Sequence, residues 1–388
     1  IKNIKLHHDK VPTEFSDIIT IEDHQKAQTY TVVKNKFSII GILIHAIVLL
    51  IWLKTDALNI FHNFVTGSIE GNILQGVIFI IGFSVVNSII SIPESLYSTF
   101  IIEEKFGFNK TTPKMFIIDL AKQFVLSMVI GVPFLSLVLW ILYSLGANWW
   151  IYTWAFIIAF QFLIIWAYPK FIAPLFNQFT KLDDDELISE INQLSERCDI
   201  KFKDYFIMNA SIRSSHGNAY FTGFGKNKRI VFFDTLLKSL AKTEVISVLA
   251  HELGHLKRKH ILKSIITSSV LLFAGLWILG QVYNNPGLFE AFGIQTNQPY
   301  MALLIFTLII PYYTFFFTPI SSWMSRKNEF EADEFAATYA SAKELITALL
   351  KMYKDNSSTL TPHPIYSKFY FSHPPAKERI EFLNTFSS

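Results

Sequence analysis

The sequence has little charge and almost no cysteine. Charged residues make up 17% of its 388 positions, whereas soluble domains carry about 25%, and hydrophobic residues reach 51%. This balance indicates a membrane protein. The single cysteine, Cys198, excludes an internal disulfide framework, and we interpret it as a structural or surface thiol.

Two further absences restrict the function. The formal net charge is only +3, which argues against nucleic acid as a partner, because nucleic-acid binding needs a clustered basic face. The first 36 residues contain no apolar core after a basic start, so they do not form a signal peptide. The chain begins with Ile1 and not with Met, and we therefore expect a truncated or processed chain.

Long apolar runs are what the sequence has instead. A membrane-spanning helix needs about 20 apolar residues, and six runs without Asp, Glu, Lys or Arg qualify: 37–53, 73–92, 124–145, 149–168, 264–283 and 300–324. The first is short for a span. Pro311 and Pro319 predict that the last one is kinked or broken.

The basic residues give the spans an orientation. One alternating set of loops has almost no Lys or Arg, and the other set is basic, with residues Lys105, Lys110, Lys114, Lys122, Lys257, Arg258, Lys259, Lys263, Arg326, Lys327, Lys377 and Arg379. By the positive-inside rule the basic set faces the cytoplasm. The membrane would be the endoplasmic reticulum in a eukaryote and the inner or plasma membrane in a bacterium. Both large polar regions then lie on one side, so one metal site can draw ligands from both.

Four parts follow along the chain. We expect membrane helices and loops over 1–168, a small α+β unit over 169–263, two further membrane helices over 264–324, and a polar C-terminal part over 325–388 that lies on the same side as the α+β unit. In the α+β unit, apolar residues at helical spacing predict a helix over 183–197. Aromatic and β-branched residues predict strands over 205–208 and 229–233.

A metal-binding motif lies at the end of the α+β unit. The stretch 235–260 has the pattern of a helix, with Thr243 as N-cap of its second part, and it contains "HELGH". His251 and His255 are four residues apart, so on a helix they lie on one face and can share a zinc ion. Glu252 can accept a proton from a zinc-bound water. The alternative is a chance occurrence of H-E-x-x-H, which is common.

Zinc proteases with H-E-x-x-H fall into classes that differ in the residue that supplies the third zinc ligand. A pattern that continues H-E-x-x-H with a glycine and a third histidine fails here, because Arg258 and Ile261 occupy those places and His260 is off by one. A gluzincin-like arrangement takes a glutamate from a later helix, and "SRKNEFEADEF" supplies Glu329. Asp333, one turn on, can hold the other nitrogen of a ligand histidine. Glu331 and Glu334 point elsewhere on that helix, and the alternative is a solvated acidic helix.

Two more stretches are candidates for the site. Residues 213–237 are dense in Gly and Asn before an apolar strand, and an extended edge there can pair with a substrate backbone, with Asn218 and Ala219 as contacts. His373 precedes two prolines, and a rigidly placed histidine can stabilise an oxyanion. The alternatives are a structural loop histidine for His373 and a capping or surface role for His216.

These stretches occur together, in the same order, in a known family. "IEEKFGFNKTTP", "HGNAYFTGFGKNKRIVFFDTLL", "VLAHELGHLKRKH", "SRKNEFEAD" and "SHPPAKERI" are shared. From about residue 29 to its C-terminus the chain resembles the type I CaaX prenyl proteases, the a-factor-converting enzymes. The resemblance implies a mainly α protein, a multi-span membrane helical barrel that encloses a large water-filled chamber, with a small α+β zinc-metalloprotease domain.

The resemblance also implies roles for single residues. His251, His255 and Glu329 would bind one Zn²⁺, Glu252 would be the base, and His373 would help the transition state. Asp333 would hold one of the ligand histidines from behind, and Asn218 would bind the backbone of the substrate. Arg379 would lie near the site and bind the substrate. The partners would be a lipidated peptide or protein and membrane lipid. The family has seven spans, so we expect the missing one to precede Ile1.

Three other functions are open. A membrane quality-control protease with the same site would cut unprenylated or misfolded chains. A transporter or membrane scaffold would have structural histidines, but the spans lack the ionisable residues of ion-coupled transporters. A site-2-type protease is suggested by "NNPG" at 284–287, but it needs an aspartate ligand near that motif, where Gly287 and Leu288 follow Pro286. The C-a-a-X endopeptidase accounts for more of the motifs than these do.

Overall fold

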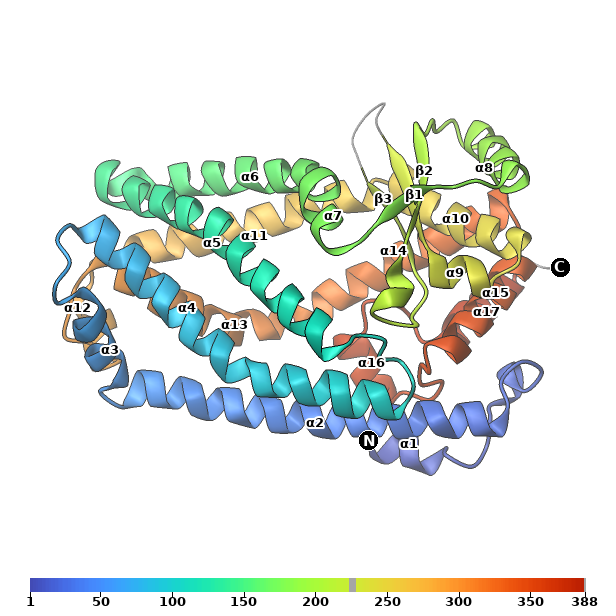
Figure 1. Cartoon of the computed structure of the whole chain (residues 1–388), viewed down its shortest axis with the longest axis horizontal. Helices are drawn as coiled ribbons and strands as arrows, with labels where there is room; N and C mark the ends of the chain where they lie inside the picture. The colour runs from blue at the N-terminus through green and yellow to red at the C-terminus, as the bar shows by residue number, and fades with distance from the viewer. Residues whose placement is uncertain (223–227, 387–388) are drawn as a thin grey trace.

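Long helices run along the molecule, and a small sheet with shorter helices lies at one end (Figure 1). The structure is a computed structural model that describes residues 1–222 and 228–386. Residues 223–227, in the Gly- and Asn-rich stretch named above, lie outside the described residues. The predicted fold class, a mainly α membrane protein with a small α+β domain, is confirmed.

Six helical segments in the described part of the chain are long and apolar enough to cross a membrane. They are Ile21–Lys54, Asn72–Glu103, Pro113–Ser144, Gly146–Phe176, His260–Val282 and Pro299–Tyr339. The helices within them are α2 (Ile21–Lys54), α4 (Asn72–Tyr97), α5 (Pro113–Ser144), α6 (Trp149–Ala167), α7 (Ala173–Phe176), α11 (His260–Val282), α13 (Pro299–Thr314) and α14 (Thr318–Tyr339). Each predicted span coincides with one segment. The short first prediction is the apolar part of a 34-residue helix.

The last segment is broken, as its prolines predict. Helix α13 ends at Thr314, a 3₁₀ turn covers Phe315–Phe317, and α14 begins at Thr318. Pro319 lies in the first turn of α14. Backbone N–H groups of the first turn have no acceptor within the helix, so the N–H that proline lacks costs no hydrogen bond there. Helix α14 then runs unbroken to Tyr339, so the expected boundary between 324 and 325 falls inside one rigid element that joins the membrane part to the catalytic part.

Side chains do not fill the barrel along its length. In α2, the successive residues Ile42, Leu43 and Ile44 are 64%, 58% and 47% exposed, although they point about 100° apart around the helix. Gly41, in the same turn, is buried against Glu94 of α4, so the helix is packed on that side here and exposed on the others. Packed cores lie at the two ends instead. One joins α4, α5, α11 and α13 with α3 (Ala57–Thr66) and α12 (Pro286–Glu290), and the other lies in the catalytic domain.

The catalytic domain contains a four-stranded sheet in the order β1-β2-β4-β3. Its strands are β1 (Phe179–Lys181), β2 (Asp204–Met208), β3 (Ala219–Thr222) and β4 (Arg229–Phe233). The central pair β2 and β4 is parallel, and the outer strands are antiparallel to their neighbours. Both predicted strands are confirmed as this central pair. The outer strands were not predicted, because three or four residues carry too little pattern.

Helices α8 (Asp185–Arg197) and α10 (Lys242–Lys257) share a core with the sheet. Asp184 caps α8 by accepting the N–H of Leu187, and Leu187, Ile191 and Leu194 are buried as predicted. Cys198 is buried in the same core, and burial raises the pKa of its thiol. A buried thiol with a raised pKa is structural and unreactive.

The stretch 235–260 is helical in two parts, as expected, but the expected N-cap of the second part is wrong. The chain forms α9 (Asp234–Ser239), then α10, and α11 begins at His260. Thr243 is not the N-cap, because α10 begins at Lys242 and the Glu244 carboxylate accepts the N–H of Ala241 at 2.7 Å. The Thr243 hydroxyl donates instead to Glu344, in α15 (Ala342–Asp355), at 2.8 Å. A carboxylate at the third helical position thus replaces the hydroxyl cap.

The short helices α16 (Pro364–Tyr370) and α17 (Ala376–Asn384) complete the domain around α14. At the N-terminus, α1 (Lys2–Leu6) precedes a loop whose Phe15 and Ile19 pack on Leu350 of α15 and Ile380 of α17. The start of the chain therefore holds the end of the chain in place.

Close packing of α10 on α14 positions the site. Gly254 lies so near α14 that a Cβ added there would be 2.9 Å from Ala332 Cα and 3.0 Å from Phe335 Cβ. Both contacts are closer than van der Waals separation, and one of them is to backbone. Only glycine permits this approach of the helix that carries H-E-x-x-H to the helix that carries Glu329.

We expect Gly254→Ala to lower both stability and zinc content. The added methyl group pushes α10 and α14 apart, with a cost of about 1–3 kcal/mol for overpacking. Thermal unfolding in detergent and zinc per chain are the measurements. Gly275→Ala in α11 is the control, because its nearest contact is an ordinary 3.9 Å to Phe306. Unchanged zinc content and melting temperature in Gly254→Ala would contradict this account of the packing.

Candidate active site

Three side chains converge between α10 and α14. His251 and His255 lie one turn apart on α10, and Glu329 faces them from α14. The two Nε2 atoms are 3.2 Å apart, and the Glu329 carboxylate oxygens lie 3.5 Å from His251 Nε2 and 3.3 Å from His255 Nε2. Among the described residues, these three are the group whose ligand atoms gather closely enough to hold a metal ion.

The separations of these atoms fit zinc. Tetrahedral zinc with bonds of 2.0–2.1 Å places its ligand atoms about 3.3 Å from one another. The three observed distances lie within a few tenths of an ångström of that value. Glu329 Oε2 is also a buried oxygen without a hydrogen-bond partner in the described part of the chain. A buried carboxylate oxygen left without a donor is costly unless a cation meets it.

Asp333 fixes the orientation of His251. Its Oδ1 lies 2.8 Å from His251 Nδ1, so the imidazole donates there and turns Nε2 toward Glu329. Arg379, on α17, holds Asp333 in turn through two hydrogen bonds, from Nε at 2.8 Å and from Nη2 at 2.6 Å. Asp333 is fully buried and Arg379 is 5% exposed. The arginine therefore neutralises a carboxylate that would otherwise be buried without compensation.

His260 fixes the orientation of His255. Nδ1 of His255 donates to Nδ1 of His260 at 2.9 Å, and Nε2 of His260 donates to Glu331 at 3.1 Å. Each histidine of the motif is thus held from behind by a carboxylate, directly for His251 and through a second imidazole for His255. Such outer contacts set the tautomer and the direction of a ligand histidine.

The role of His260 and Glu331 was missed by sequence reasoning. The position of His260 depends on Lys259, which adopts the left-handed conformation with φ 57° and separates α10 from α11. On a continuous helix, His260 would lie five residues beyond His255 and on another face. The spacing of His255 and His260 in the sequence does not indicate that the helix ends between them. Glu331 does point away from the metal ligands, as expected, but it points toward His260.

The electrostatics of the site favour a cation and a basic Glu252. Burial is the largest effect on Glu252 and raises the pKa of its carboxyl, and among the described residues it makes no hydrogen bond or ion pair. Burial lowers the pKa of His251, but hydrogen bonds to Asp333 and Glu329 outweigh it and raise that pKa to about 9. The carboxylates that stabilise a proton on this imidazole also favour a divalent cation, and the two compete for Nε2.

The other predicted residues lie around this group. His373 is 65% exposed on the loop before α17, with Nε2 at 3.4 Å from Glu329 Oε1. Asn218 is exposed and precedes β3, the edge strand, and Ala219 is the first residue of that strand. Asn218 uses its side-chain oxygen to accept the N–H of Ala219 at 2.8 Å. The roles of these residues and of Arg379 stay predictions.

The fold and this group together define a class of protein. Two imidazoles and a carboxylate can hold zinc, and a carboxyl with a raised pKa stands beside them. Six helices of the described chain can cross a membrane. The class is that of multi-pass membrane zinc metallopeptidases.

Comparisons with known proteins give the family. A model of the CAAX prenyl protease N-terminal region, with five membrane helices, matches residues 1–178, and peptidase family M48 matches residues 181–387. The chain is 35% identical to the CAAX prenyl protease 1 homolog of Oryza sativa, over 96% of this chain and 90% of that protein. It is 33% identical to CAAX prenyl protease 1 of Saccharomyces cerevisiae, over 98% and 90%. The chain belongs to peptidase family M48, with a membrane part of the CAAX prenyl protease type.

A solved structure supports the same conclusion. The crystal structure of Ste24p from S. mikatae matches with a TM-score of 0.93 and 32% identity, covering 99% of this chain and 94% of that one. The family resemblance, the metallopeptidase class and the zinc cofactor predicted from the sequence are confirmed.

We expect His260→Ala to weaken zinc binding about 10- to 100-fold while the protein stays folded. The variant removes the contact that directs His255, but it removes no metal ligand. Competition with a chelator measures the affinity, and thermal unfolding of the zinc-free protein measures the fold. His8→Ala is the control, because His8 contacts Asp9 near the N-terminus. Equal zinc affinity in the wild type and His260→Ala would show that His260 has no part in orienting His255.

Proposed function

We propose that the protein is a zinc-dependent endopeptidase that hydrolyses peptide bonds near the C-terminus of prenylated C-a-a-X proteins or peptides. The observation that carries the proposal is the His251–His255–Glu329 group at one end of a barrel of membrane helices. Relatives that match almost the whole chain bear the name CAAX prenyl protease 1. The peptidase part would be formed jointly by 169–263 and 325–388, and membrane helices over 1–168 and 264–324 would hold it.

His251, His255 and Glu329 would hold the zinc ion. When bound, zinc supplies a Lewis acid that polarises a carbonyl oxygen and lowers the pKa of water. Glu252, beside His251 on the same helix, would accept the proton of the attacking water and deliver it to the leaving amine. Its raised pKa suits both steps, because a carboxyl is the better base and acid when its pKa lies nearer the working pH.

Residues around the metal group would position the substrate. The outer edge of β3 would pair with an extended peptide, with Asn218 and Ala219 at its start. His373 is exposed and near Glu329, which supports a role in stabilising the oxyanion. Arg379 has both of its short bonds on Asp333 and little exposed surface. This supports a positioning role for Arg379 behind His251 in place of direct contact with substrate.

The barrel would provide a path for a lipidated substrate. In its middle, α2 is exposed on the sides that face away from its contact with α4 at Gly41, which supports a water-filled interior beside the lipid. The prenyl chain would enter between helices, while the peptide reaches the site from the interior. The basic segments at the catalytic end support a cytoplasmic active site. The membrane would be the endoplasmic reticulum in a eukaryote and the inner or plasma membrane in a bacterium.

Cleavage of a farnesylated C-a-a-X peptide and its unprenylated twin, by purified protein in detergent, tests the proposal. We expect release of the tripeptide from the farnesylated peptide, detected by mass spectrometry. Glu252→Ala should lower the rate at least 10²-fold with zinc content unchanged, because proton transfer typically contributes 10²–10⁴-fold. Glu334→Ala, an exposed glutamate on α14, is the matched control and should cleave normally.

The outcomes of this assay separate the alternatives. Equal cutting of both peptides would favour a quality-control protease for unprenylated or misfolded chains. Normal cleavage by Glu252→Ala would exclude Glu252 as the base. Cleavage of neither peptide by zinc-loaded protein would sink the proposed activity.

The pKa of Glu252 predicts the acidic side of the pH profile. Burial raises this pKa above the ordinary value of 4.5, and the base must be unprotonated to accept a proton. We therefore expect kcat/KM to fall, as pH decreases, at a pH above 4.5, with zinc content measured at each pH. A profile that stays flat to below pH 4.5 would contradict the assignment.

A further inference from the structure

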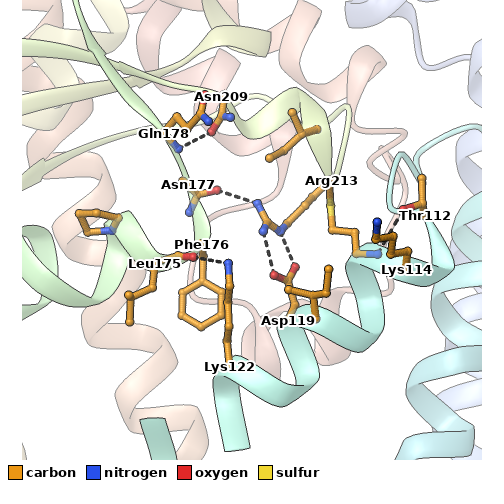
Figure 2. Close-up of a pocket in the computed structure, with 14 residues that line it drawn as sticks. Thr112, Lys114, Asp119, Lys122, Leu175, Phe176, Asn177, Gln178, Asn209 and Arg213 are labelled. Atoms are coloured by element: carbon orange, nitrogen blue, oxygen red, sulfur yellow. Dashed lines mark hydrogen bonds and ion pairs between the residues drawn. The ribbon is translucent and has the colours of Figure 1, made fainter. Parts of the chain in front are cut away.

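A polar pocket lies away from the metal group, where the start of α5 approaches the chain on either side of β1 (Figure 2). Its volume is about 490 Å³. Residues from 112–122, 174–178 and 209–213 line it. It therefore sits at the catalytic-domain end of α5 and just beyond α6, where these membrane helices leave the bilayer.

Most side-chain hydrogen-bond acceptors of this pocket are already used. Both carboxylate oxygens of Asp119 accept from Arg213, at 2.8 and 3.0 Å. The side-chain oxygen of Asn177 accepts from Arg213 at 3.2 Å, and that of Asn209 accepts the N–H of Gln178 at 2.7 Å. Figure 2 shows the Arg213 guanidinium between Asn177 and Asp119, and the Gln178–Asn209 bond beyond Asn177. A ligand that needs acceptors from the protein finds few here.

The donors, in contrast, are in excess. Lys114 is exposed and has no partner in the described chain, and Lys122 gives one of its three N–H groups to the carbonyl of Leu175 at 2.7 Å. Arg213 uses three of its five N–H groups in the bonds above. The charges of Arg213 and Asp119 cancel, so the two lysines leave a net charge of +2. Excess donors with net positive charge favour an anion.

An apolar groove continues from this pocket along the membrane. It has a volume of about 500 Å³, lies between α5 and α6, and shares Leu175 with the polar pocket. Every residue that lines it is apolar. Near its far end the Phe134 ring of α5 packs against α6, with its centroid 5.4 Å from that of Phe156 and 4.7 Å from that of Phe160. In Figure 1, α5 and α6 meet at that end and diverge toward the sheet.

The length of the groove matches one leaflet. Its residues on α5 run from Leu126 to Leu137, a rise of about 16 Å at 1.5 Å per residue. Half of the hydrocarbon core of a bilayer measures about 15 Å. The groove begins one turn beyond Lys122, so a ligand with its charge at the lysines would lay its chain directly along it.

We propose that the polar pocket and the groove together bind one anionic phospholipid of the surrounding leaflet. Its phosphate lies between Lys114, Lys122 and Arg213, and one acyl chain fills the space between α5 and α6. A phosphate suits this pocket better than a peptide carboxylate, because its several oxygens can use donors that two carboxylate oxygens leave unpaired. The bound lipid would join α5 to α7 at the point where Lys122 now links them, through its bond to the Leu175 carbonyl and its position 5.9 Å from the centre of the Phe176 ring.

The test is lipid binding by the purified, delipidated full chain in detergent, measured by native mass spectrometry. Phosphatidylglycerol and phosphatidylcholine with identical acyl chains are compared. We expect at least tenfold tighter binding of phosphatidylglycerol. Lys114→Gln together with Lys122→Gln should weaken it about 30-fold, at about fivefold for each lysine near a membrane surface. Lys114→Gln alone, which removes no contact within the described chain, should weaken it about fivefold.

Matched controls separate this site from general attraction to a basic surface. Lys105→Gln together with Lys110→Gln makes the same charge change in the same segment, outside the pocket lining. This pair should bind phosphatidylglycerol within twofold of the wild type. Ala167→Trp narrows the groove, so it should weaken phosphatidylglycerol binding and leave the binding of inorganic phosphate unchanged. Zinc content confirms that each variant is folded.

Four results would overturn the proposal. They are equal binding of the two lipids, equal losses in the pocket and control lysine pairs, and inorganic phosphate that binds as tightly as the lipid. The fourth is competitive displacement of phosphatidylglycerol by the farnesylated peptide, which would make the groove a substrate subsite.

Discussion

The close contact of α10 with α14 at Gly254 is the constraint on which the rest of the site depends. The candidate zinc ligands come from two helices and are 74 residues apart at His255 and Glu329, and to share a zinc ion their atoms must meet within about 3.3 Å of one another. A side chain at residue 254 would collide with the backbone of Ala332. The missing side chain therefore decides whether the two halves of the catalytic domain form one metal site. Because α14 continues from the last membrane segment, the same contact also ties the site to the barrel.

Each carboxylate behind the two histidines of the motif has hydrogen-bond donors as partners. Asp333 is fully buried between His251 and Arg379, and its two oxygens accept from both. Glu331 plays the corresponding part behind His260. A buried carboxylate without such partners would cost several kcal/mol in desolvation. The arrangement turns both imidazoles toward Glu329, and Glu252 stays without a hydrogen bond or ion pair among the described residues.

The membrane part follows a different principle from the catalytic part. The largest core among its described helices lies near the end that contains Tyr300 and Trp149, whereas the catalytic domain forms the second large core. Between these cores the spans diverge, and their apolar side chains stay exposed. The divergence of α5 and α6 leaves an apolar groove between them. A barrel of this kind serves a reaction in which a water-dependent site must accept a ligand from the bilayer.

The sequence by itself determined what depends on local pattern. Apolar runs gave the six spans, because a bilayer imposes both length and composition on a helix. H-E-x-x-H gave His251 and His255, because residues four apart share a helix face, and Glu329 was found as the acidic residue of a later helix on the same side. Only the tertiary structure decided what depends on long-range contact or on single dihedral angles. The left-handed Lys259 turned His260 back onto His255, Asp333 met Arg379 across two helices, and Gly254 set the distance between α10 and α14. These features have no sequence period, because each results from the packing of segments that are not neighbours in the chain.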